Sequence, residues 1–414
     1  MKVLLIGNGG REHALAYKIA QSSKVEKIYC SKGNGGTAVE EKCENVNLST
    51  IEELANFAEE NKIDLTIVGP EKELCDGIVD EFKSRGLKIF GPSKEAAKLE
   101  GSKAFSKDFM RKYGVKTAEY GNFDNLDEAL RYVERCEIPV VVKADGLAAG
   151  KGVIIASTRE EAIDAVKELM ENRTLGDAGK TIVIEEFLEG VEASILSITD
   201  GEVIIPFISS KDHKAIGEGN TGLNTGGMGT IAPNPYCTDE VLKDFSENIM
   251  IPTLEGIKKE NLDYIGIIFF GVMITKKGVY LLEYNVRMGD PETQVVLPLM
   301  ESDLVEVIDS AINKNLKNIK VLFKNAYACC VIGASKGYPK KYEKGFEITG
   351  IDNSKAKTFF AGVKEEDGKL LTNGGRVLGV TSIGKTLEQA RANAYAGIEN
   401  IKFDGMYYRK DIGK

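Results

Sequence analysis

Short apolar runs alternate with amphipathic stretches along the first hundred residues of the chain. Residues 11–20 carry apolar side chains at helical spacing, and a similar pattern predicts a helix over 93–112. Strands that alternate with helices in this way build a parallel sheet with helices on both faces. The pattern therefore predicts a doubly wound, Rossmann-like α/β fold for this part. Its expected strands are 2–6, 25–30, 65–68 and 87–90.

The rest of the chain combines apolar runs with loops of small residues. Helices are expected at 301–314 and 387–401. The block from 326 to 414 joins short strands to the second of these helices, which predicts an α/β unit. We expect this unit to pack over the functional site of the preceding part of the chain. The expected strands before it are 139–143, 153–156, 181–187 and the apolar run that contains Glu283 and Asn285.

Composition narrows the class of protein. A chain of 414 residues with 43% hydrophobic and 28% charged residues can bury a large core in about two to four domains. The formal charge of −9 argues against a nucleic-acid groove, which needs concentrated Lys and Arg. No apolar run is long enough for a membrane span, and the apolar start at 1–6 is too short for a secretory signal. We expect a cytoplasmic enzyme of small molecules, with neither nucleic acid nor membrane as partner.

Cysteines and histidines restrict the metal chemistry. The seven cysteines lack C-x-x-C spacing, which predicts reduced thiols. Only two histidines are present, so a His-rich transition-metal site is excluded by count.

The stretch LLEYNVRMGDPETQ, at 281–294, carries the most informative chemistry. Successive strand residues alternate faces, so Glu283 and Asn285 point the same way, and both offer oxygen to a hard cation. Arg287 has the same parity if the strand continues that far. Its planar guanidinium can hold a carboxylate or a phosphate at two points. This combination predicts phosphoryl-transfer chemistry.

Gly7-x-Gly9-Gly10 lies at the first predicted strand-to-helix turn. A dinucleotide fingerprint would need a small residue at position 12, so Glu12 disfavours a nicotinamide site. An anion at the helix N-terminus and a tight turn without a ligand both remain open. Glu71 is expected at the carboxyl end of the third strand, where ligands collect in open α/β sheets; a solvated loop carboxylate is the alternative.

Two segments in the middle of the chain fit a nucleotide site. The loop 144–152 consists largely of small residues and contains Lys151, and Lys143 precedes it; small residues let the backbone approach a polyphosphate. The loop has no Walker A pattern. Strand 181–187 leads into an acidic run that reaches Glu192. A strand end can pair with a purine and a nearby acid with ribose, although an exposed acidic run would look the same.

The segment 217–229 contains six glycines. Such density predicts a phosphate loop or a closing lid, with glycine-rich disorder as the alternative. Asp212, His213 and Lys214 precede the segment. His213 fits either a proton shuttle or a neutral structural histidine.

Together these motifs resemble the phosphoribosylamine-glycine ligase (glycinamide ribonucleotide synthetase) family of the ATP-grasp superfamily. The resemblance runs essentially from end to end. It rests on the residues at 7–14, 69–71, 90–94, 99–103, 142–152, 185–190, 212–214, 224–229, 287–292 and 373–378.

The resemblance implies an ATP-grasp fold in three domains. These are an N-terminal Rossmann-like domain at 1–101, an ATP-grasp domain at 102–325 with a small mobile lid at about 120–190, and a C-terminal α/β domain at 326–414. It also implies a ligase of purine (IMP) biosynthesis that joins glycine to 5-phosphoribosylamine. The expected cofactors are ATP and Mg²⁺, or Mn²⁺ in its place. A monomer or weak homodimer would suffice for a site enclosed by one chain.

The resemblance carries roles onto matching residues. Glu283 and Asn285 would bind the metal. Arg287 would stabilise the acyl-phosphate oxygens, and Asp212 would hold the glycine ammonium. The nucleotide would be held by Lys103, Lys143, Lys151, Glu185, Glu186, Phe187, Leu188 and Glu192. The phosphoribosylamine pocket would be formed by Asn8, Gly9, Gly10, Arg11, Glu71, Lys214, Asp290 and Pro291.

The chain departs from the family pattern in two motifs. Met288 replaces a usual Phe, an apolar exchange that should spare the chemistry. Phe360-Ala361-Gly362-Val363 stands where His-Ala-Gly-Thr is common, so a titratable group and a hydroxyl are lost. Two other functions compete with the ligase: another ATP-grasp ligase, such as a carboxylase or a formate-dependent transformylase, and an ATP-binding regulator without turnover. The metal pair together with Arg287 argues against the regulator, because binding alone needs no transition-state clamp.

Overall fold

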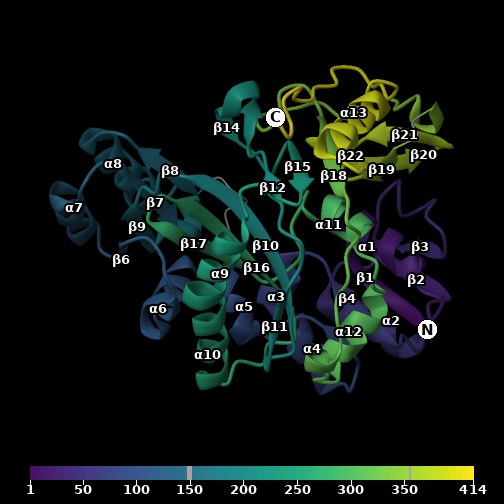
Figure 1. Cartoon of the computed structure of the whole chain (residues 1–414), viewed down its shortest axis with the longest axis horizontal. Coiled ribbons are helices and arrows are strands. Elements are labelled where there is room, and N and C mark those ends of the chain that lie inside the picture. The colour runs from purple at the N-terminus through teal and green to yellow at the C-terminus, as the bar shows by residue number, and fades with distance from the viewer. Residues whose placement is uncertain (147–151, 354–355) are drawn as a thin grey trace.

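The N-terminal part is a five-stranded parallel sheet in the order β3-β2-β1-β4-β5 (Figure 1). The structure is a computed structural model that describes residues 1–146, 152–353 and 356–414. The four predicted strands are present, and the sequence pattern missed β3, which is short and polar and lies at the sheet edge. The strands are β1 (Lys2–Gly7), β2 (Lys27–Lys32), β3 (Cys43–Val46), β4 (Leu65–Val68) and β5 (Ile89–Phe90).

Strand order reverses between β1 and β4, so the carboxyl ends of these strands form the switch point of the sheet. The turn after β1 leads into the first helix there, and Glu71 begins the third helix directly after β4. The helices of this part are α1 (Gly10–Ala20), α2 (Ile51–Glu60), α3 (Glu71–Asp76) and α4 (Ile78–Ser84).

The single helix expected at 93–112 is wrong, because the structure has α5 (Lys94–Gly101) and α6 (Lys103–Tyr113) instead. Ser102 separates them in an extended conformation with φ −136° and ψ 114°. Its hydroxyl accepts a hydrogen bond from the amide of Phe105, so it caps α6. The break makes Lys103 the first residue of a new helix.

A small antiparallel sheet in the order β6-β9-β7-β8 lies at the left of Figure 1 beside two helices. It has its own buried cluster, to which residues of both helices contribute. The predicted strands 139–143, 153–156 and 181–187 are confirmed within a residue at each end. The elements are β6 (Tyr120–Phe123), α7 (Leu126–Arg135), β7 (Val140–Ala144), β8 (Val153–Ala156), α8 (Arg159–Val166) and β9 (Ile182–Glu186).

A second antiparallel sheet, in the order β11-β10-β16-β17, carries the metal-pair motif on its last strand. Helices α9 and α10 pack beside it. The elements are β10 (Val191–Thr199), β11 (Ile204–Pro206), α9 (Asp239–Phe245), α10 (Ile251–Lys259), β16 (Gly266–Thr275) and β17 (Gly278–Asn285).

The last large sheet, in the order β12-β15-β18-β22-β19, combines strands from two parts of the chain. Its first two strands come from the middle of the sequence, so the block 326–414 shares a sheet with the preceding residues. Whether the domain boundaries fall where we placed them stays a prediction. The strands are β12 (Lys211–Asp212), β15 (Gly229–Ala232), β18 (Tyr327–Ala334), β19 (Lys357–Phe360) and β22 (Arg376–Gly384).

Two hairpins and three α-helices complete the described chain, apart from short 3-10 and π-helical turns. The helices expected at 301–314 and 387–401 are present in shorter form. The hairpins are β13 (Ala215–Gly217) with β14 (Thr221–Asn224) and β20 (Val363–Glu366) with β21 (Lys369–Thr372). The helices are α11 (Thr293–Leu299), α12 (Leu304–Ile312) and α13 (Leu387–Ile398).

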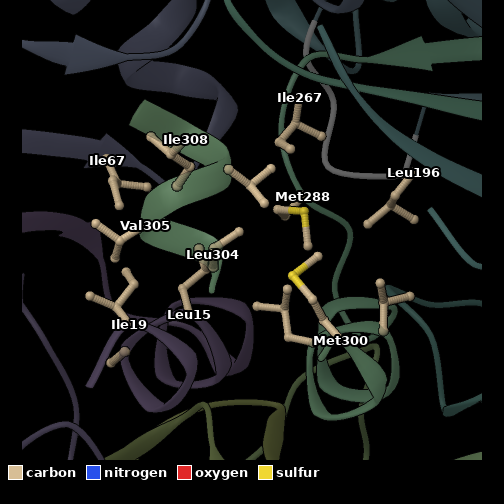
Figure 2. Packing of buried hydrophobic residues seen from close by; sticks show 14 of the residues in the cluster. Leu15, Ile19, Ile67, Leu196, Ile267, Met288, Met300, Leu304, Val305 and Ile308 are labelled. Atoms are coloured by element: carbon tan, nitrogen blue, oxygen red, sulfur yellow. The ribbon is translucent and has the colours of Figure 1, made fainter. Parts of the chain in front are cut away.

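One buried cluster joins the N-terminal layer to the rest of the molecule (Figure 2). It packs α1 and β4 against α12 and against the sheet that contains β10 and β16. This continuity fixes the switch point of the first sheet relative to β17. In the described part of the chain, no helix has the length and apolar character needed to cross a membrane. The residues labelled in Figure 2 are Leu15, Ile19, Ile67, Leu196, Ile267, Met288, Met300, Leu304, Val305 and Ile308.

Candidate active site

Strand β17 presents Glu283 and Asn285 two residues apart near its carboxyl end. The register with β16 shifts between Gly271 and Val272, which gives β17 an extra residue just before Glu283. Such a bulge twists the strand and re-aims its side chains. A Cβ at Gly271 would lie 3.2 Å from Cγ of Glu283, so glycine there leaves space for the carboxylate stem.

Four cations surround the Glu283 carboxylate. Burial by itself would raise the pKa of Glu283, but the charges of Lys214, Lys143, Lys103 and Arg287 outweigh it and lower the pKa. Glu283 is therefore ionised near neutral pH. An ionised carboxylate among cations provides a place for a metal ion together with further anions.

Arg287 is held by three side chains. Its guanidinium lies 2.7 Å from Oε1 of Glu100 and 3.3 Å from Oε2 of Glu71, and it donates to Oδ1 of Asn285 at 2.9 Å. Burial would raise the pKa of Glu71, but the charges of Arg287 and Arg11 lower it. Glu100 is more deeply buried, and burial raises its pKa despite Arg287. Glu71 is therefore part of an ion-pair network and not a solvated loop carboxylate.

The glycine turn after β1 is filled by protein carboxylates. Oε2 of Glu12 accepts from the amide of Gly9 at 2.6 Å, and a Cβ at Gly69 would lie 2.1 Å from Oε1 of Glu12. Glu12 thus occupies the switch-point crevice that a dinucleotide would need. A Cβ at Gly9 or Gly10 would lie 3.3 Å or 3.6 Å from the carboxylate of Asp290. An anionic ligand at this helix N-terminus would therefore share the turn with Glu12 and Asp290.

Asp290 connects the turn to the C-terminal part of the chain. Its Oδ2 lies 3.4 Å from Nη2 of Arg376, and its Oδ1 accepts from Nε2 of Gln294 at 2.8 Å. Arg376 also donates to the main-chain oxygens of Asp290 and Gly226, at 2.7 and 2.6 Å. Burial would raise the pKa of Asp290, but Arg376 and Arg11 lower it. Pro291 follows and is buried.

Asp212, which is half-buried, and Glu292, which is buried, form a pair of interacting acids. Burial, and then the charge of Glu292, raises the pKa of Asp212 well above its usual value. The pKa of Glu292 is also raised, chiefly by burial, although Ser194 donates to its Oε1 at 3.0 Å. A Cβ at Gly227 would lie 2.5 Å from both Oδ1 of Asp212 and Cδ of Pro291. A cation bound beside the pair, such as an ammonium group, would favour the ionised form of these carboxyl groups and would be attracted to them.

On the nucleotide side, Glu185 lies between two lysines. Its carboxylate lies 2.6 Å from Nζ of Lys107 and also pairs with Lys143. Burial would raise the pKa of Glu185, but both lysines lower it. Lys103 donates to the carbonyl of Gly146 at 3.3 Å, at the start of the small-residue loop. The predicted contact residue Lys151 lies outside the described residues.

Glu192 and Lys214 pair with each other at 2.8 Å, with both side chains about half exposed. The charge of Glu192 raises the pKa of Lys214. The predicted adenine frame, Glu186 to Leu188, lies where β9 passes into β10, and Phe187 is 37% exposed. This pairing puts a predicted ribose contact beside a predicted phosphoribosylamine contact.

The glycine-rich segment is ordered around the β13-β14 hairpin. Arg409 donates to the carbonyl of Ala215 at 2.9 Å, and Asp411 accepts from the amide of Gly219 at 2.8 Å, so the C-terminal residues anchor the hairpin. His213 uses both ring nitrogens on backbone groups: Nδ1 lies 3.0 Å from the carbonyl of Gly229, and Nε2 accepts from the amide of Gly413 at 3.2 Å. Burial lowers its pKa to about 4. The structural interpretation of His213 is therefore favoured over the proton shuttle.

Comparison with known proteins identifies the family. Models of phosphoribosylglycinamide synthetase match as its N domain over 1–100, its ATP-grasp (A) domain over 101–293 and its C domain over 328–414. The phosphoribosylamine–glycine ligase of Clostridium acetobutylicum is 63% identical over 100% of both chains. That of Fusobacterium nucleatum is 59% identical over 100% of this chain and 98% of the relative. The chain belongs to the phosphoribosylamine–glycine ligase family. The family comprises ATP-grasp ligases of purine biosynthesis that make glycinamide ribonucleotide.

Solved structures agree with the ligase fold. The phosphoribosylamine–glycine ligase of Thermotoga maritima matches with a TM-score of 0.88 and 34% identity over 100% of both chains. The biotin carboxylase domain of Hydrogenobacter thermophilus 2-oxoglutarate carboxylase, solved with MgADP and bicarbonate, matches with a TM-score of 0.76 over 98% of this chain and 91% of that one. At 16% identity the second match shows the fold alone. The predicted ATP-grasp fold with an N-terminal parallel sheet is confirmed.

The metal pair of this ligase-family chain fits a magnesium ion. Among the described residues, no group of three or more His, Cys, Asp and Glu could hold a metal. Mg²⁺ usually takes one or two carboxylates and completes its octahedron with water and substrate phosphates. Glu283 supplies an ionised carboxylate and Asn285 a carbonyl oxygen that already accepts one hydrogen bond, which leaves its second lone pair.

Sequence reasoning assigned no role to several residues that the structure brings into this ligase-type site. Arg376 lies in the quoted 373–378 motif, so a signal was present there. Glu100 and Glu292 also lie at quoted motifs. Lys107 carried no signal, because only the fold brings α6 alongside β9. The residues are Glu100, Lys107, Glu292 and Arg376.

Proposed function

We propose that this ligase-family chain joins glycine to 5-phosphoribosylamine through a glycyl phosphate. The observation that carries the proposal is the end of β17, where Glu283 faces four cations while Arg287 reaches Glu71 at the switch point of the first sheet. A phosphoryl-transfer site at Glu283 would then lie next to a sugar-phosphate pocket at Glu71, which supports the proposal. A ligase that uses both needs them at reacting distance.

The chemistry has two steps. A carboxylate is a poor electrophile, so a carboxylate oxygen of glycine first attacks the γ-phosphorus of ATP, and ADP leaves. The amine nitrogen of phosphoribosylamine then attacks the acyl carbon, the carbon–oxygen bond to phosphate breaks, and the amine loses a proton. The products are glycinamide ribonucleotide, ADP and phosphate. Charge develops on phosphoryl oxygens in both steps, and fixed cations stabilise it.

The nucleotide would lie between the small sheet and β17. Lys103 and Lys143 are assigned to the ATP phosphates, because both contribute to the field around Glu283. Glu186 to Leu188 are assigned to adenine and Glu192 to the ribose hydroxyls. Lys151 and Glu185 belong to the same proposed site, although the Glu185 carboxylate is already engaged by Lys107 and Lys143. Glu185 therefore acts by orienting Lys143.

The two other substrates would lie beside the nucleotide, toward Arg287 and the switch point of the first sheet. Asp212 is assigned to the glycine ammonium, which its pairing with Glu292 supports. Arg287 is assigned to the acyl-phosphate oxygens. The phosphoribosylamine pocket would be formed by Asn8, Gly9, Gly10, Arg11, Glu71, Lys214, Asp290 and Pro291.

A divalent ion is part of the proposal. Glu283 and Asn285 would hold Mg²⁺ or Mn²⁺, and the ion would supply positive charge to the transferring phosphoryl group. The side chains of the protein would bind and orient the substrates. The lysines hold the nucleotide, and Arg287 holds the acceptor oxygens.

The test measures ADP release with ATP and magnesium while glycine or phosphoribosylamine is omitted in turn. The unstable amine is generated in place from phosphoribosyl pyrophosphate and ammonia. ADP release that requires both substrates, with glycinamide ribonucleotide as product, supports the proposal. Release driven by bicarbonate or formate without glycine would indicate another ATP-grasp ligase. Tight ATP binding without release would indicate a regulator.

A further inference from the structure

The segment 360–363, where this chain departs from the usual His-Ala-Gly-Thr, packs against the glycine turn after β1. A Cβ at Gly10 would lie 3.5 Å from Cβ of Ala361, and the amide of Gly35 donates to the carbonyl of Val363 at 3.0 Å. These contacts join residues that lie more than 300 positions apart in the sequence. The C-terminal segment therefore forms a wall beside the turn.

Asn34 ties the turn to this segment through a single amide group. Its Nδ2 donates to the carbonyls of Asn8, Gly9 and Phe360, at 3.0, 3.2 and 2.8 Å. Its Oδ1 accepts from the amides of Gly36 and Thr37, which fixes the orientation of the side chain. Asn34 is 7% exposed, so water cannot easily replace these bonds.

His13, on α1, makes a second tie. Its Nδ1 accepts from the amide of Phe360 at 2.8 Å, and its Nε2 lies 3.1 Å from Oε2 of Glu40. A backbone amide only donates, so the ring proton is on Nε2 and points to Glu40. Glu40 also pairs with Lys357 at 2.6 Å, and the Phe360 ring stacks on the imidazole with centroids 5.8 Å apart. Burial lowers the pKa of His13, which favours this neutral form.

The same segment touches the arginine that holds Asp290. The amide of Gly362 donates to the carbonyl of Arg376 at 3.0 Å, and Arg376 reaches the carboxylate and carbonyl of Asp290. Asp290 in turn lies against Gly9 and Gly10. The turn, Asp290, Arg376 and segment 360–363 therefore form one closed ring of contacts.

We propose that His13 and Asn34 are positioning residues that fasten segment 360–363 onto the glycine turn and so shape the phosphoribosylamine pocket. We call His13, Asn34 and this segment the clasp. The inference rests on the proposed function of the site. Main-chain groups of Phe360 make the clasp bonds, so the loss of the family's usual histidine at this position leaves them intact.

A matched pair of variants at His13 separates the two bonds of the imidazole. In H13N the side-chain oxygen takes the place of Nδ1 and keeps the bond to the Phe360 amide. In H13Q the amide group takes the place of Nε2 and keeps only the contact with Glu40. Losing one buried hydrogen bond should raise the KM of H13Q for phosphoribosylamine about five- to tenfold. The KM values for ATP and glycine, and kcat, should stay unchanged, and H13N should match the parent chain.

Amide hydrogen exchange over 357–366 gives a second readout that needs no activity. Exchange should quicken in H13Q and not in H13N. N34D, which has the same size, turns a carboxylate oxygen toward three carbonyl oxygens and should raise the KM for phosphoribosylamine by more than about tenfold.

The outcomes are distinct. Unchanged exchange in H13Q would show that the bond between His13 and the Phe360 amide does not hold the segment in place. Faster exchange with an unchanged KM for phosphoribosylamine would show that the clasp has no effect on the pocket. Either result overturns the inference. An equal rise in all three KM values would do the same. A parent chain that makes no glycinamide ribonucleotide would overturn the proposed function, while the exchange data would still report whether the clasp exists.

Discussion

Replacing Glu185 with Gln should destabilise the protein more than replacing Lys107 with Met. The Lys107, Glu185 and Lys143 side chains are 4%, 2% and 9% exposed and form two cations around one carboxylate. E185Q removes the carboxylate that both buried lysines share. K107M leaves Lys143 and Glu185 as a neutral pair.

The magnitudes follow from this difference. Breaking a buried ion pair by removing one partner typically costs about 3–5 kcal/mol, which is the expected loss for E185Q. K107M loses the hydrogen bond from Nζ to Oγ1 of Thr117 and the ion pair with Glu185, which leaves one oxygen of each residue without this partner. That loss is about 1–3 kcal/mol and is partly offset by the apolar methionine, so we expect about 1–2 kcal/mol for K107M.

Urea unfolding followed by far-UV circular dichroism measures both variants, because the chain has no tryptophan for fluorescence. The pKa of Glu185 is lowered in the folded state by Lys143 and Lys107 against the effect of burial. Its stabilising contribution is therefore present above the unfolded value of about 4.3 and is lost as pH falls through the folded value. The difference in free energy of unfolding between the parent and E185Q should therefore decrease as pH falls through that range. A K107M variant that is as unstable as E185Q, or a gap that does not change with pH, would refute the reasoning.

Three further predictions concern the proposed site. E283Q should lower turnover at limiting magnesium by more than about 100-fold, the upper end of what losing a metal's second-shell partner costs, and near-normal turnover would remove Glu283 from the ligand set. D212N should raise the KM for glycine. The pKa of Asp212 is raised in the folded state, so the parent protein loses stability as pH rises above about 4, the unfolded pKa of an aspartate. D212N lacks this ionisation, so its urea midpoint should rise relative to that of the parent from about pH 4 upward. A relative rise toward low pH would contradict this. G227A should lower the free energy of unfolding by more than about 1 kcal/mol, because φ is +113° and the new Cβ would meet Asp212 and Pro291. The variant should also raise the KM for glycine, and a KM equal to that of the parent would show that this contact does not shape the pocket.

Elements with a strong apolar pattern could be predicted from the sequence. Strands β1, β4, β7, β8 and β9 were found because each is a run of Val, Ile or Leu bounded by polar residues. The edge strand β3 was missed because Cys43–Val46 has no such pattern and gains its place from pairing with β2. The break at Ser102 was missed because its cap interaction overrides a helical pattern on both sides.

Part of the proposed site could also be predicted from the sequence. The spacing of Glu283, Asn285 and Arg287 predicted a shared face, and the motif at 7–11 predicted a turn at the first strand end. The ring of contacts around that turn could not be predicted, because Asn34 meets Phe360 across 326 positions. Lys107 lacked a signal for the same reason, since its partner Glu185 lies on another element. Long-range ion pairs depend on the fold and leave no local pattern.

The central claim is that the γ-phosphoryl group passes to the carboxylate of glycine, and an isotope experiment tests it directly. Glycine labelled with oxygen-18 in both carboxylate oxygens is converted in ordinary water with ATP and phosphoribosylamine, and the released phosphate is analysed by mass spectrometry. The account predicts that each phosphate carries a single oxygen-18 atom from glycine, with the other label retained in glycinamide ribonucleotide. Unlabelled phosphate, whether it forms together with glycinamide ribonucleotide or without it, would contradict the account.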